Sequence, residues 1–87
     1  MNTVYLERRD PSKNMMRFYS IRITLTLFGQ WALIRQWGRI GSTGAMLEHW
    51  FDTRDEAEKA GAKLCRAKER RGYLRLGSVS LFLTSNS

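Results

Sequence analysis

The sequence has few of the features that would place it outside a reducing compartment or inside a membrane. Its 87 residues include one cysteine, Cys65, so no internal disulfide can form. No apolar run approaches the roughly 20 residues that a membrane-spanning helix needs. The N-terminal residues 1–7 lack the basic and then apolar pattern of a signal peptide. We therefore expect a cytoplasmic protein that does not interact with membranes.

The residue sets on which most catalytic and metal sites depend are also missing. His49 is the only histidine, and its alternation in phase with Leu47 and Phe51 favours a core or interface position. Cys65 is expected on the flank of a helix with no histidine near it in sequence, which favours an inert, semi-buried thiol over a nucleophile. One histidine and one cysteine cannot form the usual zinc sets, and the glycines do not form a G-x-G-x-x-G loop. We therefore predict no catalytic residue, no metal and no cofactor.

Acidic residues are few and unevenly distributed. The chain has 15 lysines and arginines against 8 aspartates and glutamates, a net charge of +7. Residues 1–58 hold eight basic and seven acidic side chains, a net of +1, whereas residues 59–87 hold seven and one, a net of +6. Such concentrated charge favours nucleic acid or another polyanion as the partner. The alternative is a solvated helix face that keeps the protein soluble.

The pattern of apolar residues predicts several β-strands. Alternation from Tyr19 to Leu27 is typical of a strand with one buried face, and residues 31–37 return as a second strand, so residues 18–37 form a long hairpin. A third strand is expected over residues 46–51, a short edge strand over 4–9, and one or two closing strands between 73 and 83. We expect one domain over residues 1–76, with residues 77–87 as a C-terminal strand or loose tail.

One helix is predicted after the third strand. Thr53 and Glu56 form a capping box at its start, and Gly72 is placed for its C-terminal cap. Small apolar residues from Ala57 to Ala67 form one stripe, and a second stripe on the solvent side is basic and consists of Lys59, Lys63, Arg66 and Arg70. The fold class is therefore α+β, an antiparallel sheet of about four to six strands with one helix packed on it.

The stretch from Gln36 to Gly44 combines Trp37, Arg39 and three glycines. A tryptophan and an arginine beside flexible backbone can stack on a planar group and bind an anion. The same residues could equally close a β-hairpin. Basic residues near these aromatics are suited to contact phosphates, sugars or bases, and they are Arg17, Arg22, Arg35 and Arg39.

These residues resemble a known family. Residues 37–44, Trp-Gly-Arg-Ile-Gly-Ser-Thr-Gly, are similar to the motif of the WGR domain, which is best known from the DNA-dependent poly(ADP-ribose) polymerases. Residues 17–23 resemble the basic-aromatic strand of that family, residues 51–57 its strand-to-helix step, and residues 68–73 its helix end. The resemblance covers about residues 4–76, and a chain of this size resembles the stand-alone WGR proteins of bacteria.

The resemblance implies a module that binds double-stranded DNA at ends, nicks or gaps through sugar-phosphate contacts, without catalysis. By position, Trp37 would lie against a terminal sugar or base, Gly38 would let the backbone approach the phosphates, and Arg39 would hold a phosphate. Further contacts would come from Lys13, Arg17 and Arg35. Met16 stands where the polymerases often carry asparagine, and Asn14 lies two residues earlier.

Alternatives remain open for the partner and for the basic stripe. RNA could replace DNA, and a protein-interaction module in which Arg39 meets an acidic partner is the second function considered. The stripe of Lys59, Lys63, Arg66 and Arg70 is either a second phosphate-binding patch or a solvated surface. We expect a monomer with weak sequence specificity, because no segment resembles a helix that reads the major groove.

Overall fold

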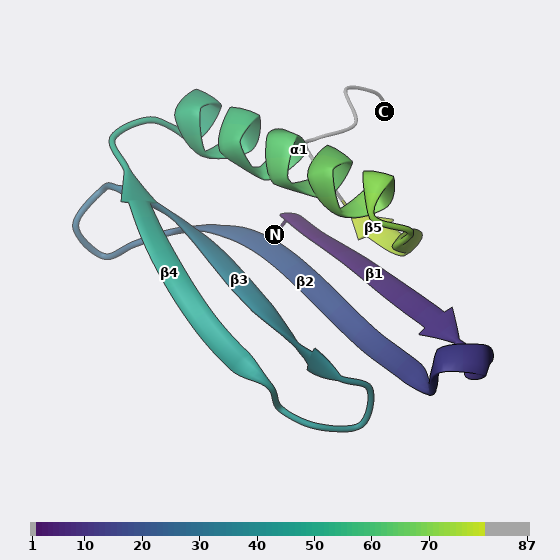
Figure 1. Cartoon of the computed structure of the whole chain (residues 1–87). Helices are drawn as coiled ribbons and strands as arrows, with labels where there is room; N and C mark the ends of the chain where they lie inside the picture. The colour runs from purple at the N-terminus through teal and green to yellow at the C-terminus, as the bar shows by residue number, and fades with distance from the viewer. Residues whose placement is uncertain (1, 80–87) are drawn as a thin grey trace.

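A five-stranded antiparallel sheet carries a single long helix on one face (Figure 1). In this computed structural model, which describes residues 2–79, the order of strands across the sheet is β4-β3-β2-β1-β5. The elements are β1 (Asn2–Asp10), the short 3-10 helix η1 (Pro11–Lys13), β2 (Met15–Leu25), β3 (Trp31–Arg39), β4 (Ala45–Phe51), α1 (Arg54–Arg70) and β5 (Leu74–Val79). The predicted α+β class is confirmed.

Strand β1 lies inside the sheet, so the prediction of a short edge strand over residues 4–9 was wrong. It runs for nine residues and pairs with β2 on one side and with β5 on the other. Its Val4 and Leu6 are fully buried. The predicted closing strand forms up to Val79, and its remaining part lies outside the described residues. The division of the chain after residue 76 stays a prediction.

The core lies between the sheet and α1. It is built from the strand residues Val4, Leu6, Tyr19, Ile21, Ile23 and Leu33 together with Ala57 and Cys65 of the helix. Small residues let the helix lie close to the sheet. Cys65 was expected at the flank of the helix, but it is fully buried and accepts a hydrogen bond from Arg75 Nη2 at 2.9 Å. Burial raises the pKa of this thiol, which favours its protonated form.

Strands β2 and β3 form the long predicted hairpin, with residues from Arg17 to Leu25 paired to residues from Arg39 to Trp31. The alternation predicted that Leu25 and Leu27 lie on the buried face. They are instead 56% and 99% exposed, because the hairpin tip extends past the N-terminal end of α1, where no helix covers the sheet (Figure 1).

Both ends of α1 are capped as predicted. Thr53 Oγ1 accepts from the Glu56 N–H at 3.2 Å, and Glu56 Oε1 accepts from the Thr53 N–H at 3.3 Å. At the other end Gly72 has φ of 98°, its N–H donates to Glu69 O at 3.0 Å, and the Tyr73 N–H donates to Lys68 O at 3.1 Å. This cap fixes the end of α1 just before the chain enters β5.

Candidate nucleic-acid interface

Three arginines form a row across the end of the sheet. Strand register places Arg8 opposite Arg17, and Arg17 opposite Arg39. All three alternate in phase with Leu6, Tyr19 and the motif tryptophan, so they lie on the face that carries the helix. Among residues 2–79 the ion pairs use other basic residues, namely Arg9, Arg54, Lys59 and Arg75. Since like charges opposite each other repel, this arginine row is suited to hold an anion.

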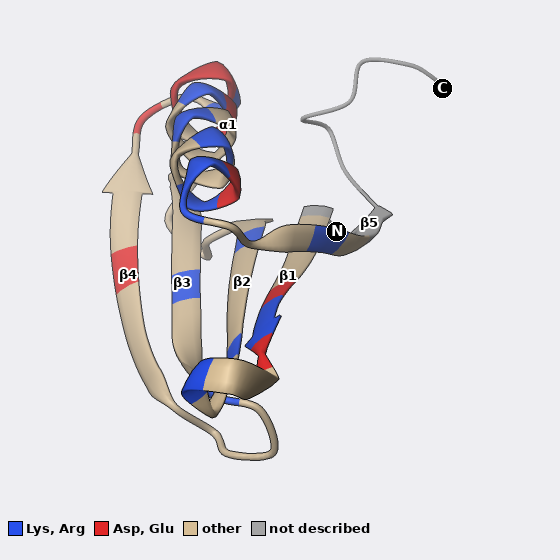
Figure 2. Ribbon diagram, turned by 45° about the vertical axis from the view of Figure 1, so that its right-hand side comes forward, with Lys and Arg blue, Asp and Glu red and all other residues tan. Residues whose placement is uncertain are grey.

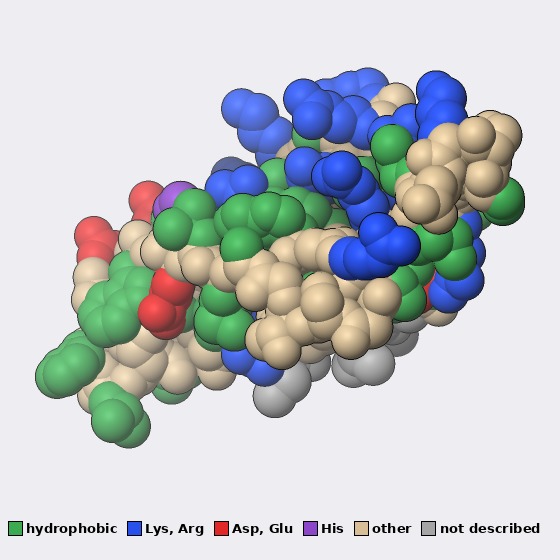
Figure 3. Space-filling model, turned by 60° about the horizontal axis from the view of Figure 1, so that its bottom comes forward, with side chains coloured by type: hydrophobic (Ala, Val, Ile, Leu, Met, Phe, Trp, Pro, Cys, Tyr) green, Lys and Arg blue, Asp and Glu red, His purple; other side chains and the backbone are tan. Residues whose placement is uncertain are grey.

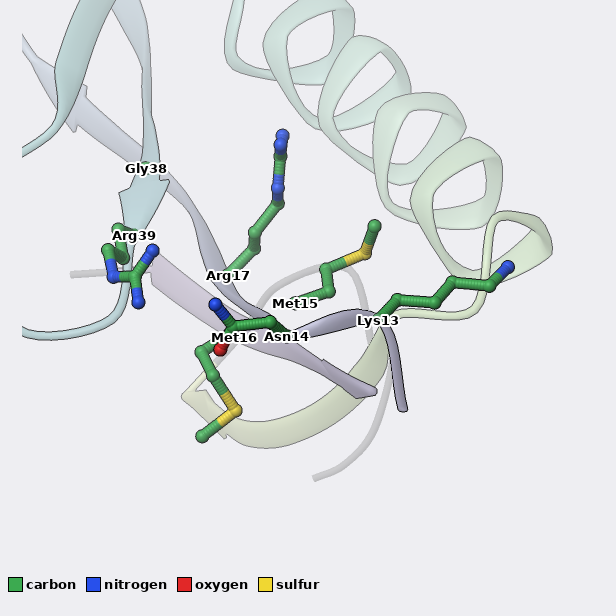
Figure 4. A pocket seen from close by; sticks show the side chains of 7 residues that line it. All are labelled: Lys13, Asn14, Met15, Met16, Arg17, Gly38 and Arg39. Atoms are coloured by element: carbon green, nitrogen blue, oxygen red, sulfur yellow. The ribbon is translucent and has the colours of Figure 1, made fainter. Parts of the chain in front are cut away.

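A cleft of about 340 Å³ opens beside the arginine row (Figure 4). Arg17 extends from it toward the helix, Arg39 lies at one wall, and Lys13 points away from Arg39 at the other (Figure 4). The structure thus brings together four of the six predicted contact residues, since Gly38 also lines the cleft. Asn14 and Met16 lie there as well, so Asn14 supplies an amide group to the cleft.

A row of aromatic residues lies next to the arginine row on the same face. The ring of Trp37 stacks on the ring of Tyr19, with centroids 5.8 Å apart and an interplanar angle of 15°. The Arg35 guanidinium lies 5.5 Å from the Trp37 ring centroid, and its Nε donates to Tyr19 Oη at 2.7 Å. Trp37 is packed against the core but remains partly exposed. It therefore has structural contacts with Tyr19 and Arg35 while part of its surface remains exposed to solvent.

Lys68 of the last helical turn joins this cluster. Its Nζ lies 4.5 Å from the centroid of Tyr19 and 5.9 Å from that of Tyr73. Burial lowers the pKa of Lys68, and the positive charges of Arg71 and Arg35 lower it further. A cation in such surroundings gains from an incoming phosphate, because the anion offsets both the burial and the repulsion.

Sequence reasoning did not identify Arg8 and Lys68 as site residues. The sequence did carry a signal for Lys68. It follows Gly61 by seven residues and Leu64 by four, so it lies on the side of the helix that carries the apolar stripe and not on the side of the basic stripe. Arg8 could be found only from the register of β1 with β2, which depends on the turn between them.

The motif glycines shape the loop between β3 and β4. Gly44 has φ of 72°, and a Cβ atom on it would overlap the carbonyl group of Trp37. A Cβ on Gly38 would lie 2.8 Å from Gly44 Cα, so the two glycines allow the loop to fold back on β3. The Arg39 carbonyl accepts from Ser42 N at 3.0 Å and Ser42 Oγ at 2.7 Å, which fixes the backbone of Arg39. The predicted phosphate contact of Gly38 stays a prediction.

The four residues of the basic stripe, Lys59, Lys63, Arg66 and Arg70, are all exposed. Lys59 Nζ pairs with Asp55 Oδ2 at 3.1 Å. Lys63 lines a shallow apolar groove of about 370 Å³ together with Arg35 and His49, so it faces the same side of the molecule as the aromatic row. Figure 2 shows positive residues along successive turns of α1 and acidic ones at its first turn. The contact of this stripe with phosphate stays a prediction.

The residues with catalytic potential are dispersed. His49 is partly buried, with its Nε2 3.4 Å from Arg35 Nη1, while Cys65 belongs to the core. Within residues 2–79, no three side chains of His, Cys, Asp or Glu come together in a way that could hold a metal ion. In the same range no helix is long and apolar enough to cross a bilayer.

The sheet, its helix and the cationic, aromatic end of the sheet define a small α+β binding domain. The family described as the WGR domain matches residues 2–79, and the chain belongs to this family. Family membership points to a nucleic-acid-binding module.

Two proteins show how such a domain occurs in longer chains. The protein y4dW of Sinorhizobium fredii, described as uncharacterized, is 46% identical over 70 residues, which are 80% of this chain and 34% of y4dW. The crystal structure of a Bacteroides fragilis protein is similar with a TM-score of 0.73 and 25% identity, over 86% of this chain and 19% of that one. The chain therefore spans only a minor part of either protein.

Proposed function

We propose that this WGR domain binds double-stranded DNA at ends, nicks or gaps through sugar-phosphate contacts and does not catalyse a reaction. The observation that carries the proposal is the arginine row of Arg8, Arg17 and Arg39 beside the stacked ring of Trp37. The three arginines supply charge for successive phosphates, and the aromatic ring supplies a surface for a sugar or base.

The arrangement favours a strand terminus over continuous duplex. In continuous duplex the bases are stacked on both sides, so a ring such as Trp37 can reach only the backbone. At an end or nick, a terminal sugar or base is open on one side, and it can lie against Trp37 while Arg39 and Arg17 hold the adjacent phosphates. Asn14 and Lys13, on the rim of the cleft, would extend the contact.

The second function is a protein-interaction module in which Arg39 docks on an acidic partner. The arginine row, in which Arg17 and Arg39 are exposed, supports it equally, because carboxylates and phosphates both accept bidentate bonds from guanidinium groups. The salt dependence of the affinity distinguishes the two functions. DNA binding releases condensed counterions, so the logarithm of its affinity falls linearly with the logarithm of the salt concentration. We further propose that the domain acts as a monomer in the cytoplasm.

The test is a fluorescence-anisotropy titration with three labelled ligands: an intact circularised duplex, a nicked duplex with a 5′-phosphate, and a single strand. We expect the nicked duplex to bind most tightly, and its affinity to fall by roughly 10²-fold or more between about 50 mM and about 200 mM salt. An RNA duplex of the same sequence distinguishes the two nucleic acids.

The matched variants are Arg39→Gln and Arg22→Gln. Each removes one arginine charge from the hairpin, but Arg22 lies on the face without the helix. Arg39→Gln should weaken binding to the nick about tenfold, and Arg22→Gln should leave it within about twofold. Equal, weak binding of all three ligands that Arg39→Gln does not change would refute the strand-end proposal.

A further inference from the structure

The tip of the β2–β3 hairpin exposes a cluster of apolar side chains at the end of the sheet opposite the arginine row. Besides Leu25 and Leu27, Phe28 is 79% exposed and Trp50 of β4 is 47% exposed. The rings of Phe28 and Trp50 pack together with centroids 6.2 Å apart. In Figure 3 apolar side chains gather at this end of the molecule, while most of the basic side chains lie toward the other end. We call these four residues the tip cluster; such exposed apolar patches mark interaction sites.

The backbone holds the tip cluster in a fixed geometry. Thr26 Oγ1 accepts hydrogen bonds from the N–H groups of Phe28 and Gln30, both at 3.2 Å. The Thr26 N–H donates to Gln30 O at 2.8 Å, and Gly29 takes φ of 81°. Gln30 Nε2 also donates to Asp52 Oδ1 at 3.3 Å, which ties the loop to the end of β4. A preformed apolar surface loses little conformational entropy when a partner binds.

Two carboxylates lie beside the tip cluster, although the protein as a whole is basic. Glu48 lines a groove of about 300 Å³ with Leu25 and Trp50, and Asp52 lies at the neighbouring end of β4. The nearest basic residue along the chain is Arg22, which strand register places in one row with Ile34 and Glu48, but Arg22 and Glu48 are not among the ion pairs of the described residues. Arg54, the next nearest, is engaged by Glu58 at 3.1 Å and lies over the Trp31 ring. These carboxylates repel phosphate groups and favour a cationic partner.

We propose that the tip cluster binds a short protein segment that carries an apolar anchor flanked by lysine or arginine. The anchor occupies the groove between Leu25, Phe28 and Trp50, and the basic residue pairs with Glu48. Four side chains are far fewer than the roughly 20–30 residues per side of a standard interface between folded proteins, so the surface fits a peptide. A symmetric second copy would bring the acidic rims of two tips together, which disfavours self-association.

The longer relatives are consistent with such a partner. The matched region makes up 34% of the Sinorhizobium fredii protein and 19% of the Bacteroides fragilis protein. In both, a domain of this kind is joined to further polypeptide. A docking surface at the opposite end from the arginine row would leave the nucleic-acid interface free while the tip holds a neighbouring segment.

The test is selection of a displayed library of random peptides on the immobilised full chain, followed by affinity measurements with a synthetic selected peptide. We expect enriched sequences with an aromatic or aliphatic residue next to lysine or arginine. The double variant Leu27→Ser/Phe28→Ser should bind the peptide at least about tenfold more weakly, and Glu48→Lys several-fold more weakly. Arg39→Gln is the matched control and should bind it unchanged. Because Leu27 and Phe28 lie outside the core, the double variant should keep its melting temperature.

Three results would overturn the proposal. The first is no enrichment over the double variant, or enriched peptides that Glu48→Lys binds equally well. The second is binding to vesicles of phosphatidylcholine and phosphatidylserine that the double variant loses, which would assign the tip to a lipid surface. The third is a concentration-dependent dimer in analytical ultracentrifugation that the double variant abolishes, which would assign it to a second copy.

Discussion

Arg17 and Arg39 are direct register partners across β2 and β3, with both side chains on the helix-bearing face. Like charges directly opposite each other in a sheet are generally destabilising, and Arg8 on β1 adds a third charge to this row. None of these three arginines takes part in the ion pairs of the described residues, so no carboxylate neutralises them there. We therefore expect the arginine row to lower the stability of the free protein and to become favourable when an anion lies across it.

The first prediction follows from the like charges of Arg17 and Arg39 on paired strands. Arg17→Gln should raise the free energy of unfolding by up to about 1 kcal/mol, because it removes a cross-strand repulsion. The same substitution should weaken binding to nicked DNA and lower the slope of log affinity against log salt by about 0.9 for one lost phosphate contact. Urea unfolding and anisotropy titrations at several salt concentrations measure the two effects.

Arg22→Gln on the opposite face is the control for this experiment. It removes the same charge from the same strand, and it should change neither the salt slope nor the affinity by more than about twofold. If Arg17→Gln lowered stability and left DNA affinity unchanged, the arginine row would be a structural feature rather than a binding one.

The second prediction concerns Tyr19, which positions Arg35 beside Trp37. Tyr19→Phe removes the acceptor of the 2.7 Å bond from Arg35 Nε and leaves every charge in place. We expect a loss of about 1–2 kcal/mol in stability and a roughly threefold loss in DNA affinity, with an unchanged salt slope. Tyr5→Phe is the control, because its hydroxyl bonds to Glu7 on the other face of the sheet. Equal effects of both variants on affinity would argue against a positioning role.

Much of the fold could be predicted because its signals are local. The capping box of Thr53 and Glu56 and the C-cap glycine Gly72 are readable from a few neighbouring residues, and alternation defines β2. The interior position of β1 was not predictable, because it depends on β5, which returns from the far end of α1. The exposure of Leu25 and Leu27 depends on how far the helix reaches over the sheet, and alternation carries no information on that.

The candidate site was predictable only in part, for the same reason. The motif and its neighbours identified Arg39, Arg17 and Lys13, and the structure places them around one cleft. The inclusion of Arg8 depends on strand register, and that of Lys68 on the rotation of α1 about its axis. The buried residues of α1 are Ala57, Gly61 and Cys65. With this side of the helix turned toward the sheet, Lys68 lies over the Tyr19 ring.

The third prediction is a pH dependence caused by Lys68. Its pKa in the folded protein lies below the unfolded value of 10.5, so the unfolded chain binds the proton more tightly. The stability of the wild type relative to Lys68→Met should therefore increase as the pH rises through the folded pKa toward 10.5. At neutral pH the variant should be at least as stable as the wild type and should bind nicked DNA several-fold more weakly.

Urea unfolding of both proteins at a series of pH values measures this difference. Lys59→Met removes the same charge from the exposed side of the helix and controls for the general loss of attraction to DNA. A Lys68→Met variant that is clearly less stable at neutral pH would show that the contacts of Lys68 with Tyr19 and Tyr73 outweigh its burial.

The last prediction separates two glycines of the motif loop. Gly41 and Gly44 both have positive φ, at 95° and 72°, so alanine is strained at either position by about 1–2 kcal/mol. The space around a Cβ on Gly41 is empty, whereas a Cβ on Gly44 would overlap the Trp37 carbonyl. Gly44→Ala should therefore destabilise the protein by about 1–3 kcal/mol more than Gly41→Ala. Because the displaced loop also holds the Arg39 backbone through Ser42, Gly44→Ala should weaken DNA binding even below its unfolding temperature. Equal losses of stability in the two variants, measured by thermal and urea unfolding, would show that the contact between Gly44 and Trp37 does not determine the loop.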